Sequence, residues 1–320
     1  MDMKSKVLSL VIALVPAIYV SGDKAEKEPV DYVSPFIGTD YHGHTFPGPY
    51  LPFGMVQLSP DTGVSGWDWC SGYHYSDSSI MGFSHTHLSG TGCADYGDIM
   101  LMPTTGELKI IPGSKDNPDD GYRSRFSHSS EIAYPGYYSV TLLDYSIRAE
   151  LTVTERVGFH KYTFPADDAH ILIDLAHGIG DTTIDARMKI GKDKIEGYRY
   201  SRGWGDQCVY FLAEFSKPFV SYGTWKNGKI YRGQDRESGR DIGAFVDYSA
   251  SKGLILVKVG ISFTSIDGAR RNLEEIPDWD FDRVRAEARS TWNEELSKIE
   301  VVGAEEEKIK FYTALYHCCY

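Results

Sequence analysis

The sequence predicts a mainly β protein, in which a large antiparallel β-sandwich is followed by helices. Aromatic residues make up 13% of the chain and glycine occurs 32 times, and these residues favour strands and tight turns respectively. Between Ile99 and Thr264 short strand-like segments follow one another with no helical segment between them, which is typical of antiparallel sheets. After Pro277 the apolar residues recur every three or four positions, which indicates helices.

The expected strands are short and are bounded by turn residues. Residues 147–153 alternate polar and apolar side chains, so this strand should have one solvated and one buried face. Strands are expected at residues 99–102, 107–111, 137–143, 146–154, 157–164, 170–175, 182–190, 209–215, 229–231, 242–246 and 254–262. The first two should flank a turn at residues 103–106. The chain is expected to be all-β to about residue 270.

Two helices are expected near the C-terminus. Asp278 is a candidate N-cap for the first, whose apolar stripe comprises Phe281, Val284, Ala288, Trp292 and Leu296. The second should begin among residues 305–307, where three glutamates suit the positive end of the helix dipole. Its stripe comprises Ile309, Tyr312 and either Leu315 or Tyr316. Because such a stripe needs neighbours to bury it, we expect the chain to break off at the threshold of a helical domain.

The N-terminus has the pattern of a secretory signal. Lys4 and Lys6 precede an apolar stretch from Val7 to Val20, and small residues follow it. The stretch is too short to span a membrane and contains Pro16. No cysteine lies near the expected cleavage point, so a lipid anchor is not expected. We therefore expect a secreted or periplasmic protein with a signal peptide at residues 1–22.

Net charge and cysteine spacing narrow the classes of partner. The formal net charge is −12, so nucleic acid is not an expected partner. None of the five cysteines forms a CxxC pair, so a structural zinc site is not expected. Cys70 and Cys93 could form a disulfide, but spacing alone does not bring their Cα atoms within reach, and the pairing stays open.

The residues best suited to binding or catalysis lie between Asp31 and Asp98, where glycine and proline predict long shaped loops. Trp67 and Trp69 could belong to the sandwich core or to a surface that stacks on sugars. The histidine pairs His85/His87 and His42/His44 favour hydrogen-bonded loop histidines over a transition-metal site, because no third ligand stands at a recognisable offset. No metal site is therefore predicted.

Other catalytic patterns are missing from this segment. Residues 90–92 read Gly-Thr-Gly but lack the Lys-Ser/Thr of a phosphate-binding loop, and neither Ser84 nor Ser89 stands in a Gly-x-Ser-x-Gly elbow. Glycoside cleavage needs two carboxyl groups on either side of the bond. The candidates are Asp61, Asp68, Asp77, Asp95 and Asp98. Their spacing singles out no pair.

Several long blocks of the sequence resemble a known family. They read VSPFIGT, GHTFPG, PFGMVQLSPDT, WDWCSGYHYSD, GFSHTHLSGTGC and DYGDIMLMP, and cover most of residues 31–103. AEFSKPF (213–219) and FYTALYH (311–317) extend the likeness. In this order the blocks resemble the opening of glycoside hydrolase family 92, the secreted bacterial α-mannosidases.

The resemblance implies a domain plan. It consists of an N-terminal β-sandwich at residues 23–272, a helical linker at 273–302 and, from 303 to 320, the truncated start of an (α/α)6 catalytic barrel. It also implies exo-acting, inverting hydrolysis of terminal α-mannosidic bonds, often α-1,2, in N-glycans or mannans. A Glu would act as acid, an Asp as base, and calcium would hold and distort the sugar.

The same resemblance implies which residues of this chain take part. The acid, the base and most calcium ligands are expected beyond Tyr320, so the fragment should be inactive alone. Trp67, Asp68, Trp69 and Cys70 should form a loop that faces the barrel and contacts sugar, with His85 and His87 in support. The expected partners are mannose-containing glycans and the chain's own C-terminal (α/α)6 domain.

Two alternatives to an enzyme fragment remain open at this point. A stand-alone carbohydrate-binding module would explain the aromatic loops and the lack of a recognisable catalytic pair. A scaffold domain that only supports the barrel would make no contact with sugar.

Overall fold

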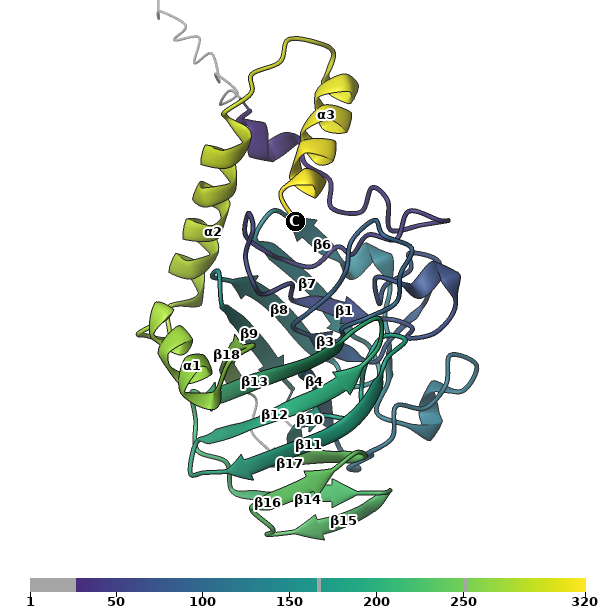
Figure 1. Cartoon of the computed structure of the whole chain (residues 1–320), viewed down its shortest axis with the longest axis vertical. Coiled ribbons are helices and arrows are strands. Elements are labelled where there is room, and N and C mark those ends of the chain that lie inside the picture. Colours follow the sequence, from purple (N-terminus) through teal and green to yellow (C-terminus); the bar gives the residue numbers. More distant parts are fainter. Residues whose placement is uncertain (1–26, 166–167, 250–252) are drawn as a thin grey trace, which may run out of the picture.

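The computed structural model describes residues 27–165, 168–249 and 253–320. The predicted signal peptide lies outside these residues. The described chain forms two large antiparallel sheets, which are followed by three helices at its C-terminal end (Figure 1). The predicted fold class is confirmed.

The first large sheet has seven strands in the order β1-β3-β4-β10-β17-β14-β15. Its strands are β1 (Ser59–Asp61), β3 (Gly82–Ser84), β4 (Met100–Thr105), β10 (Ala169–Asp174), β17 (Ile242–Tyr248), β14 (Ser221–Lys226) and β15 (Lys229–Arg232). Every pairing is antiparallel, as for Leu172, which lies opposite Met102 on one side and Phe245 on the other.

The second large sheet has nine strands in the order β16-β11-β12-β13-β18-β9-β8-β7-β6. Its strands are β16 (Arg236–Gly239), β11 (Thr182–Ile190), β12 (Lys194–Arg202), β13 (Asp206–Phe215), β18 (Gly253–Ser262), β9 (Val157–Phe164), β8 (Ile147–Val153), β7 (Tyr137–Leu142) and β6 (Ile132–Tyr134). A small ladder of β2 (Ser79–Ile80) and β5 (Ser124–Arg125) completes the described sheets.

The two large sheets share one hydrophobic core. Leu101, Ile171 and Phe245 of the first sheet belong to the same buried cluster as Leu151 and Val257 of the second. Burying these side chains between two layers is the main source of stability for a sandwich.

Three helices follow the sheets: α1 (Ile266–Asn272), α2 (Phe281–Leu296) and α3 (Glu305–Cys318). The predicted stripe of α2 is confirmed, since Phe281, Val284, Ala288, Trp292 and Leu296 are all buried. In α3 the buried side chains are Tyr312, Thr313 and Tyr316.

Three aromatic side chains fasten α2 and α3 to the loops at the top of the sandwich. Trp292 Nε1 donates to the carbonyl of Tyr50 at 2.6 Å, and the Tyr50 hydroxyl donates to the carbonyl of Tyr316 at 3.0 Å. The rings of Trp292 and Tyr316 lie 4.4 Å apart, centroid to centroid. Because all three side chains are buried, the helices and loops form one packed unit.

The structure corrects the prediction around Pro103. The expected turn at residues 103–106 is instead the second half of β4, which pairs with β10 up to Thr105. Beyond Leu101, the one residue of β4 that pairs with β3, β4 has a free edge, where proline is tolerated. The expected strand at residues 107–111 is a loop, because Gly106 at φ +77° turns the chain out of the sheet.

The helix boundaries also differ from the prediction. Ser265, whose side chain accepts from Gly268 N, caps an unpredicted helix α1 inside the stretch expected to be all-β. Asp280, and not Asp278, caps α2 by accepting from Arg283 N. The prediction also missed β12 and β14, where charged residues and glycine dilute the apolar pattern.

Candidate functional site

The glycine-rich segment between residues 33 and 98 folds into loops that cover one end of the sandwich, next to α3. These loops carry short strands only, and non-glycine residues adopt left-handed backbone angles in them, including Tyr41 (φ +54°) and His44 (φ +55°). Such angles are uncommon outside glycine and are often found at functional sites. The purple and blue loops lie beside the yellow end of α3 in Figure 1.

Trp67 lies exposed at the surface of these loops. It begins a 3-10 turn, η2 (Trp67–Trp69), and 60% of its surface is accessible. The imidazole of His44 meets the indole edge-on, with centroids 4.7 Å apart. Gly92 (φ +62°) lies against the indole, and a Cβ at Gly92 would come within 2.6 Å of the ring. The indole is therefore held in place while most of it faces solvent.

Asp68 presents its carboxylate next to this indole. His42 Nδ1 lies 2.5 Å from Asp68 Oδ1, and the Asp68 side chain is 32% exposed. The partly exposed oxygens can accept hydrogen bonds from a ligand, and His42 fixes their orientation.

Trp69 has a different environment. Its Nε1 donates to Asp77 Oδ2 at 2.7 Å, and Lys115 Nζ stands 3.5 Å from the ring centroid. A Cβ at Gly63 would lie 2.5 Å from the indole. Trp69 is thus packed and hydrogen-bonded within the loop, where it supports η2.

Cys70 ends the predicted contact loop as a buried residue. Its thiol donates to the carbonyl of Trp67 at 3.0 Å, and burial raises its pKa. Cys70 and Cys93 are both free thiols in this structure. The Cys70 side chain therefore stabilises the turn that carries Trp67 and Asp68.

His87 lies beneath the loops, fully buried. Its Nδ1 is 2.8 Å from the carbonyl of Gln57, and its Nε2 is 2.8 Å from Asp61 Oδ1. Ser84 Oγ contacts the same Nε2 at 3.1 Å. In a catalytic triad the serine and the carboxylate use different ring nitrogens, so these three residues are not arranged as one.

Asp61 joins two histidines in this buried layer. Its second oxygen lies 2.8 Å from His177 Nε2. Burial alone would raise the pKa of Asp61, but His87 and His177 hold it well below its usual range. The cluster anchors the loops to the sheet.

His85 belongs to a second buried hydrogen-bonded chain. The hydroxyl of Tyr162 lies 2.8 Å from His160 Nδ1, His160 Nε2 lies 3.0 Å from His85 Nε2, and His85 Nδ1 donates to the carbonyl of Ile99 at 2.6 Å. Burial lowers the pKa of His85 to about 4. His85 and His87 are hydrogen-bonded loop histidines, as expected, and their support of a sugar site stays a prediction.

A buried network of ion pairs connects the loop that contains Asp98 to β12. This network was not predicted from the sequence. Arg199 of β12 donates to Asp98 Oδ1 and to both oxygens of Asp181, each at 2.7 Å. All three side chains are fully buried. Arg199 lies on β12, whereas Asp98 and Asp181 lie in loops, and no sequence pattern connects three residues so far apart in the chain.

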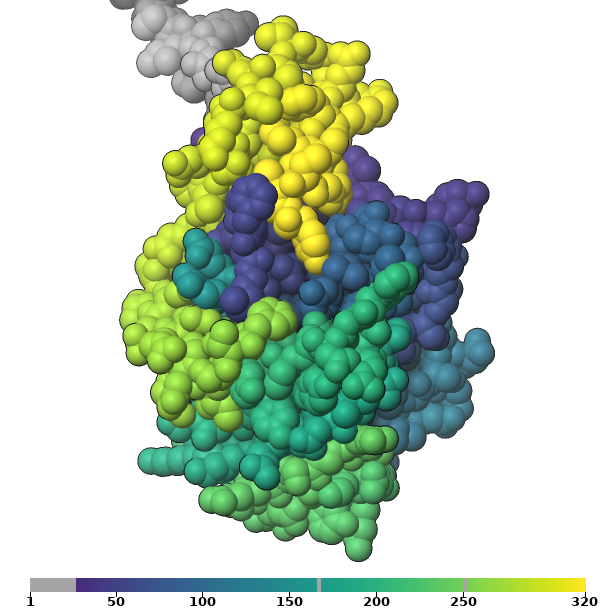
Figure 2. Space-filling view, in the orientation of Figure 1, coloured from purple at the N-terminus to yellow at the C-terminus, as the bar shows by residue number. Residues whose placement is uncertain are grey.

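The C-terminal end of α3 rests on the same loop layer. The Tyr320 hydroxyl donates to the carbonyl of His87, and His317 Nε2 lies 3.1 Å from the carbonyl of Ile37. The Tyr320 ring packs edge-on against Phe46 at 6.1 Å. In Figure 2 the yellow tip sits between purple and blue loop surfaces. The end of α3 is therefore attached to the loops of residues 33–98, which also carry Trp67.

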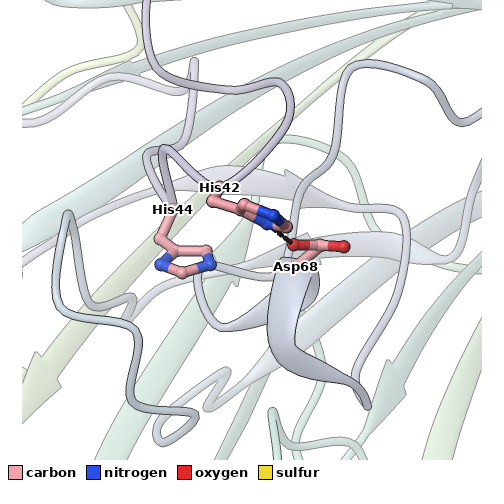
Figure 3. Close-up of side chains that lie close together, drawn as sticks. All are labelled: His42, His44 and Asp68. Carbon is pink, nitrogen blue, oxygen red and sulfur yellow. Dashed lines mark hydrogen bonds and ion pairs between the residues drawn. The ribbon is translucent and has the colours of Figure 1, made fainter.

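Within the described ranges, one group of three potential metal ligands comes together. Ligand atoms of His42, His44 and Asp68 all lie within 4.8 Å of one another (Figure 3). Calcium prefers about six to eight oxygen ligands, so two imidazoles and one carboxylate do not fit it.

Among the described residues, no helix has both the length and the apolar character needed to cross a bilayer.

Comparisons with known proteins give one consistent result. The glycosyl hydrolase family 92 N-terminal domain matches residues 32–262, and the glycosyl hydrolase family 92 catalytic domain matches residues 268–320. A fungal protein from Arthroderma benhamiae, described as an uncharacterized secreted glycosidase, is 30% identical over 340 aligned residues, which cover 97% of this chain and 43% of the relative.

Solved structures agree with these matches. A family GH92 α-mannosidase from Bacteroides thetaiotaomicron is 38% identical with a TM-score of 0.89, covering 92% of this chain and 41% of its own. An inverting GH92 mannosidase from the same organism is 30% identical with a TM-score of 0.79, covering 90% and 39%. The chain thus spans less than half the length of these relatives.

Proposed function

This chain belongs to glycoside hydrolase family 92, and we propose that it is the N-terminal part of a secreted α-mannosidase that removes terminal mannose from glycans. In this proposal the complete enzyme is exo-acting and inverting, often on α-1,2 bonds in N-glycans or mannans. The β-sandwich contributes one wall of the sugar pocket.

One observation carries the proposal: the exposed indole of Trp67 lies next to the oriented carboxylate of Asp68. An indole face packs well against the C–H groups of a sugar ring. A carboxylate beside it can accept hydrogen bonds from hydroxyls. Because His44, Gly92 and His42 hold the two side chains, little order has to be gained on binding.

Trp69 and Cys70 support this pair from below. The contacts of Trp69 with Asp77 and Lys115, and of Cys70 with the Trp67 carbonyl, favour positioning roles for both. In the complete enzyme the helical domain that begins with α3 would form the opposite wall. The contact between Tyr320 and His87 supports this placement.

We place the catalytic acid and base outside this chain. Two of its candidate carboxylates, Asp61 and Asp98, are fully buried and already paired with His87, His177 and Arg199. A solved relative is described as an inverting mannosidase, and inversion requires two carboxyl groups about 6.5–9.5 Å apart with water between them. The 320-residue chain alone is therefore expected to be inactive.

We also propose that most ligands of the calcium ion lie in the part of the complete enzyme outside this chain. The group of potential ligands found among the described residues, His42, His44 and Asp68, suits nitrogen-preferring metals and is not a calcium site. We also propose that the chain consists of a signal peptide (1–22), a β-sandwich (23–272), a helical linker (273–302) and the start of the catalytic domain (303–320). A relative described as secreted supports export.

The test is the anomer released by the complete protein from α-mannosides. Proton NMR of α-1,2-mannobiose hydrolysis should show β-mannose first, since inversion changes the configuration at the anomeric carbon. The 320-residue chain should release no mannose under the same conditions. Cleavage by that chain alone, or failure of the complete protein on every α-mannoside, would overturn the proposal.

A carbohydrate-binding module is the alternative, and the exposed Trp67 favours it as well. Calorimetry of the 320-residue chain with mannose and mannobiose separates the two. Half a pocket should bind weakly. A micromolar dissociation constant, about −8 kcal/mol, would favour the module.

A further inference from the structure

We propose that His42, His44 and Asp68 form a binding site for a divalent transition-metal ion of the Zn²⁺ class. The proposal concerns this chain's own residues and does not depend on the mannosidase activity. The three side chains come from two loops that are distant in sequence, and their ligand atoms lie within 4.8 Å of one another. Figure 3 shows His44 on one side and the His42–Asp68 pair on the other.

The unpartnered nitrogen of His44 points to a missing ligand. His44 is 7% exposed, and its Nε2 is buried with no hydrogen-bond partner among the described residues. A buried polar atom without a hydrogen-bond partner is unfavourable. Figure 3 shows a nitrogen of the His44 ring facing His42 and Asp68. A metal ion at that point would use its lone pair.

The neighbouring His74 shows how this loop layer normally treats a histidine. Its Nδ1 is 2.7 Å from Ser76 Oγ and its Nε2 is 3.1 Å from the carbonyl of Tyr41. Both of its ring nitrogens are therefore satisfied within the protein. His44 differs because its Nε2 has no hydrogen-bond partner among the described residues and faces His42 and Asp68.

The donor set selects the class of metal. Two imidazole nitrogens and one carboxylate oxygen suit Zn²⁺ and related ions, whereas Ca²⁺ and Mg²⁺ prefer oxygen. Three protein ligands leave a coordination position for water, as in open zinc sites. The His42 side chain is 50% exposed and that of Asp68 is 32% exposed, so an ion can reach the site from solvent.

The surroundings of two of the ligands hold them firmly. The carbonyl of His44 accepts from Gly90 N at 2.7 Å, and Trp67 packs edge-on against the imidazole. Asp68 lies within η2, where the thiol of Cys70 donates to the Trp67 carbonyl. These contacts restrain the backbone at His44 and Asp68 and the ring of His44, so little reorganisation of these two residues is needed for binding.

His42 supplies the adjustable ligand. Its Nδ1 is now 2.5 Å from Asp68 Oδ1, and two atoms bound to one ion at about 2.0–2.2 Å lie about 3 Å or more apart. The pair must therefore open slightly, which half-exposed His42 can do. With the ion between Nδ1 and Oδ1, neutral His42 coordinates through Nδ1 and keeps its single ring proton on Nε2, while Asp68 coordinates as the carboxylate.

Calorimetry with ZnCl₂ on the untagged, chelator-treated chain tests the proposal. We expect one ion per chain, and replacement of Zn²⁺ by Ca²⁺ should give no binding at this site. His44→Ala, His42→Ala and Asp68→Asn should each weaken Zn²⁺ binding by roughly tenfold or more. His128→Ala is the matched control, because His128 pairs with Glu131 elsewhere, and it should bind as the parent does.

Folding of each variant is checked by circular dichroism. His42 and Asp68 are partly exposed, so their variants keep the test valid if His44→Ala unfolds. Absence of Zn²⁺ binding by the parent overturns the proposal. Binding that survives His42→Ala and Asp68→Asn, for example at one of the five free thiols, overturns it equally.

Discussion

The indole of Trp67 lies edge-on to the imidazole of His44, with ring centroids 4.7 Å apart. This contact joins an exposed aromatic surface to a histidine that is almost fully buried. It also places the indole next to Asp68, whose carboxylate is paired with His42. The surface that we assign to sugar and the site that we assign to a metal ion therefore lie next to each other and share Asp68.

Trp67→Ala in the complete enzyme should reduce kcat/KM for α-mannobiose by about tenfold or more. Burial of an aromatic side chain against a ligand is worth about 1.5–3 kcal/mol, and Ala loses it. Tyr231→Ala is the control, since β15 lies at the opposite end of the molecule (Figure 1). Equal kinetics for the two variants would show that Trp67 does not contact substrate.

Trp69→Phe should lower the free energy of unfolding by about 1 kcal/mol, the usual value of one hydrogen bond. The phenyl ring keeps part of the packing against Gly63 but loses the bond to Asp77. Urea unfolding measures the change. In the complete enzyme KM should change little, and a large increase in KM with unchanged stability would place Trp69 in direct contact with sugar.

Arg199→Met should destabilise the fold by about 3–5 kcal/mol. The substitution leaves Asp98 and Asp181 buried without their cation, and removal of one partner from a buried pair carries a cost of this size. Arg202→Met is the matched control on the same strand, because its pair with Asp206 is exposed to solvent and exposed pairs contribute little to stability. Similar losses in both variants would contradict this interpretation.

Stability should fall as the pH drops from about 6.5 towards 4. Burial lowers the pKa of His85 to about 4, and burial together with His85 lowers that of His160. The ordinary value in an unfolded chain is about 6.5, so between these values the unfolded chain binds more protons than the folded one. The stability contributed by neutral His85 is complete above pH 6.5 and is lost as the pH approaches 4.

Urea unfolding at pH 7, 6 and 5 checks this prediction. His85→Gln removes one titrating group, so the variant should lose less stability over this range than the parent does, whatever its stability at pH 7. Identical pH dependence in both proteins would show that His85 does not carry the effect.

Strands with a clear apolar pattern, such as β8 and β9, and the stripe of α2 could be predicted because they depend on local periodicity. Phe281, Val284 and Trp292 recur at helical spacing and are buried as expected. Pro103 misled the prediction, since only the partner strand β10 reveals that β4 continues through it. The cap at Asp280 was missed because the sequence has an aspartate at both 278 and 280. Only the structure shows that the side chain of Asp280 accepts from Arg283 N.

The segment that forms the candidate site could be predicted from the sequence, but the arrangement of its side chains could not. Trp67 and Trp69 are the same residue type two positions apart, and the 3-10 turn gives one an exposed position and the other a packed one. The convergence of His44 with Asp68 depends on how two distant loops meet, which spacing does not encode. The same holds for the bond between Asp61 and His177.

A crystal structure of the complete enzyme with a non-hydrolysable mannoside tests the central claim most directly. Our account predicts sugar carbons within about 4 Å of the Trp67 indole and a sugar hydroxyl hydrogen-bonded to Asp68. A mannoside bound in the helical domain with no contact to Trp67 or Asp68 would contradict it.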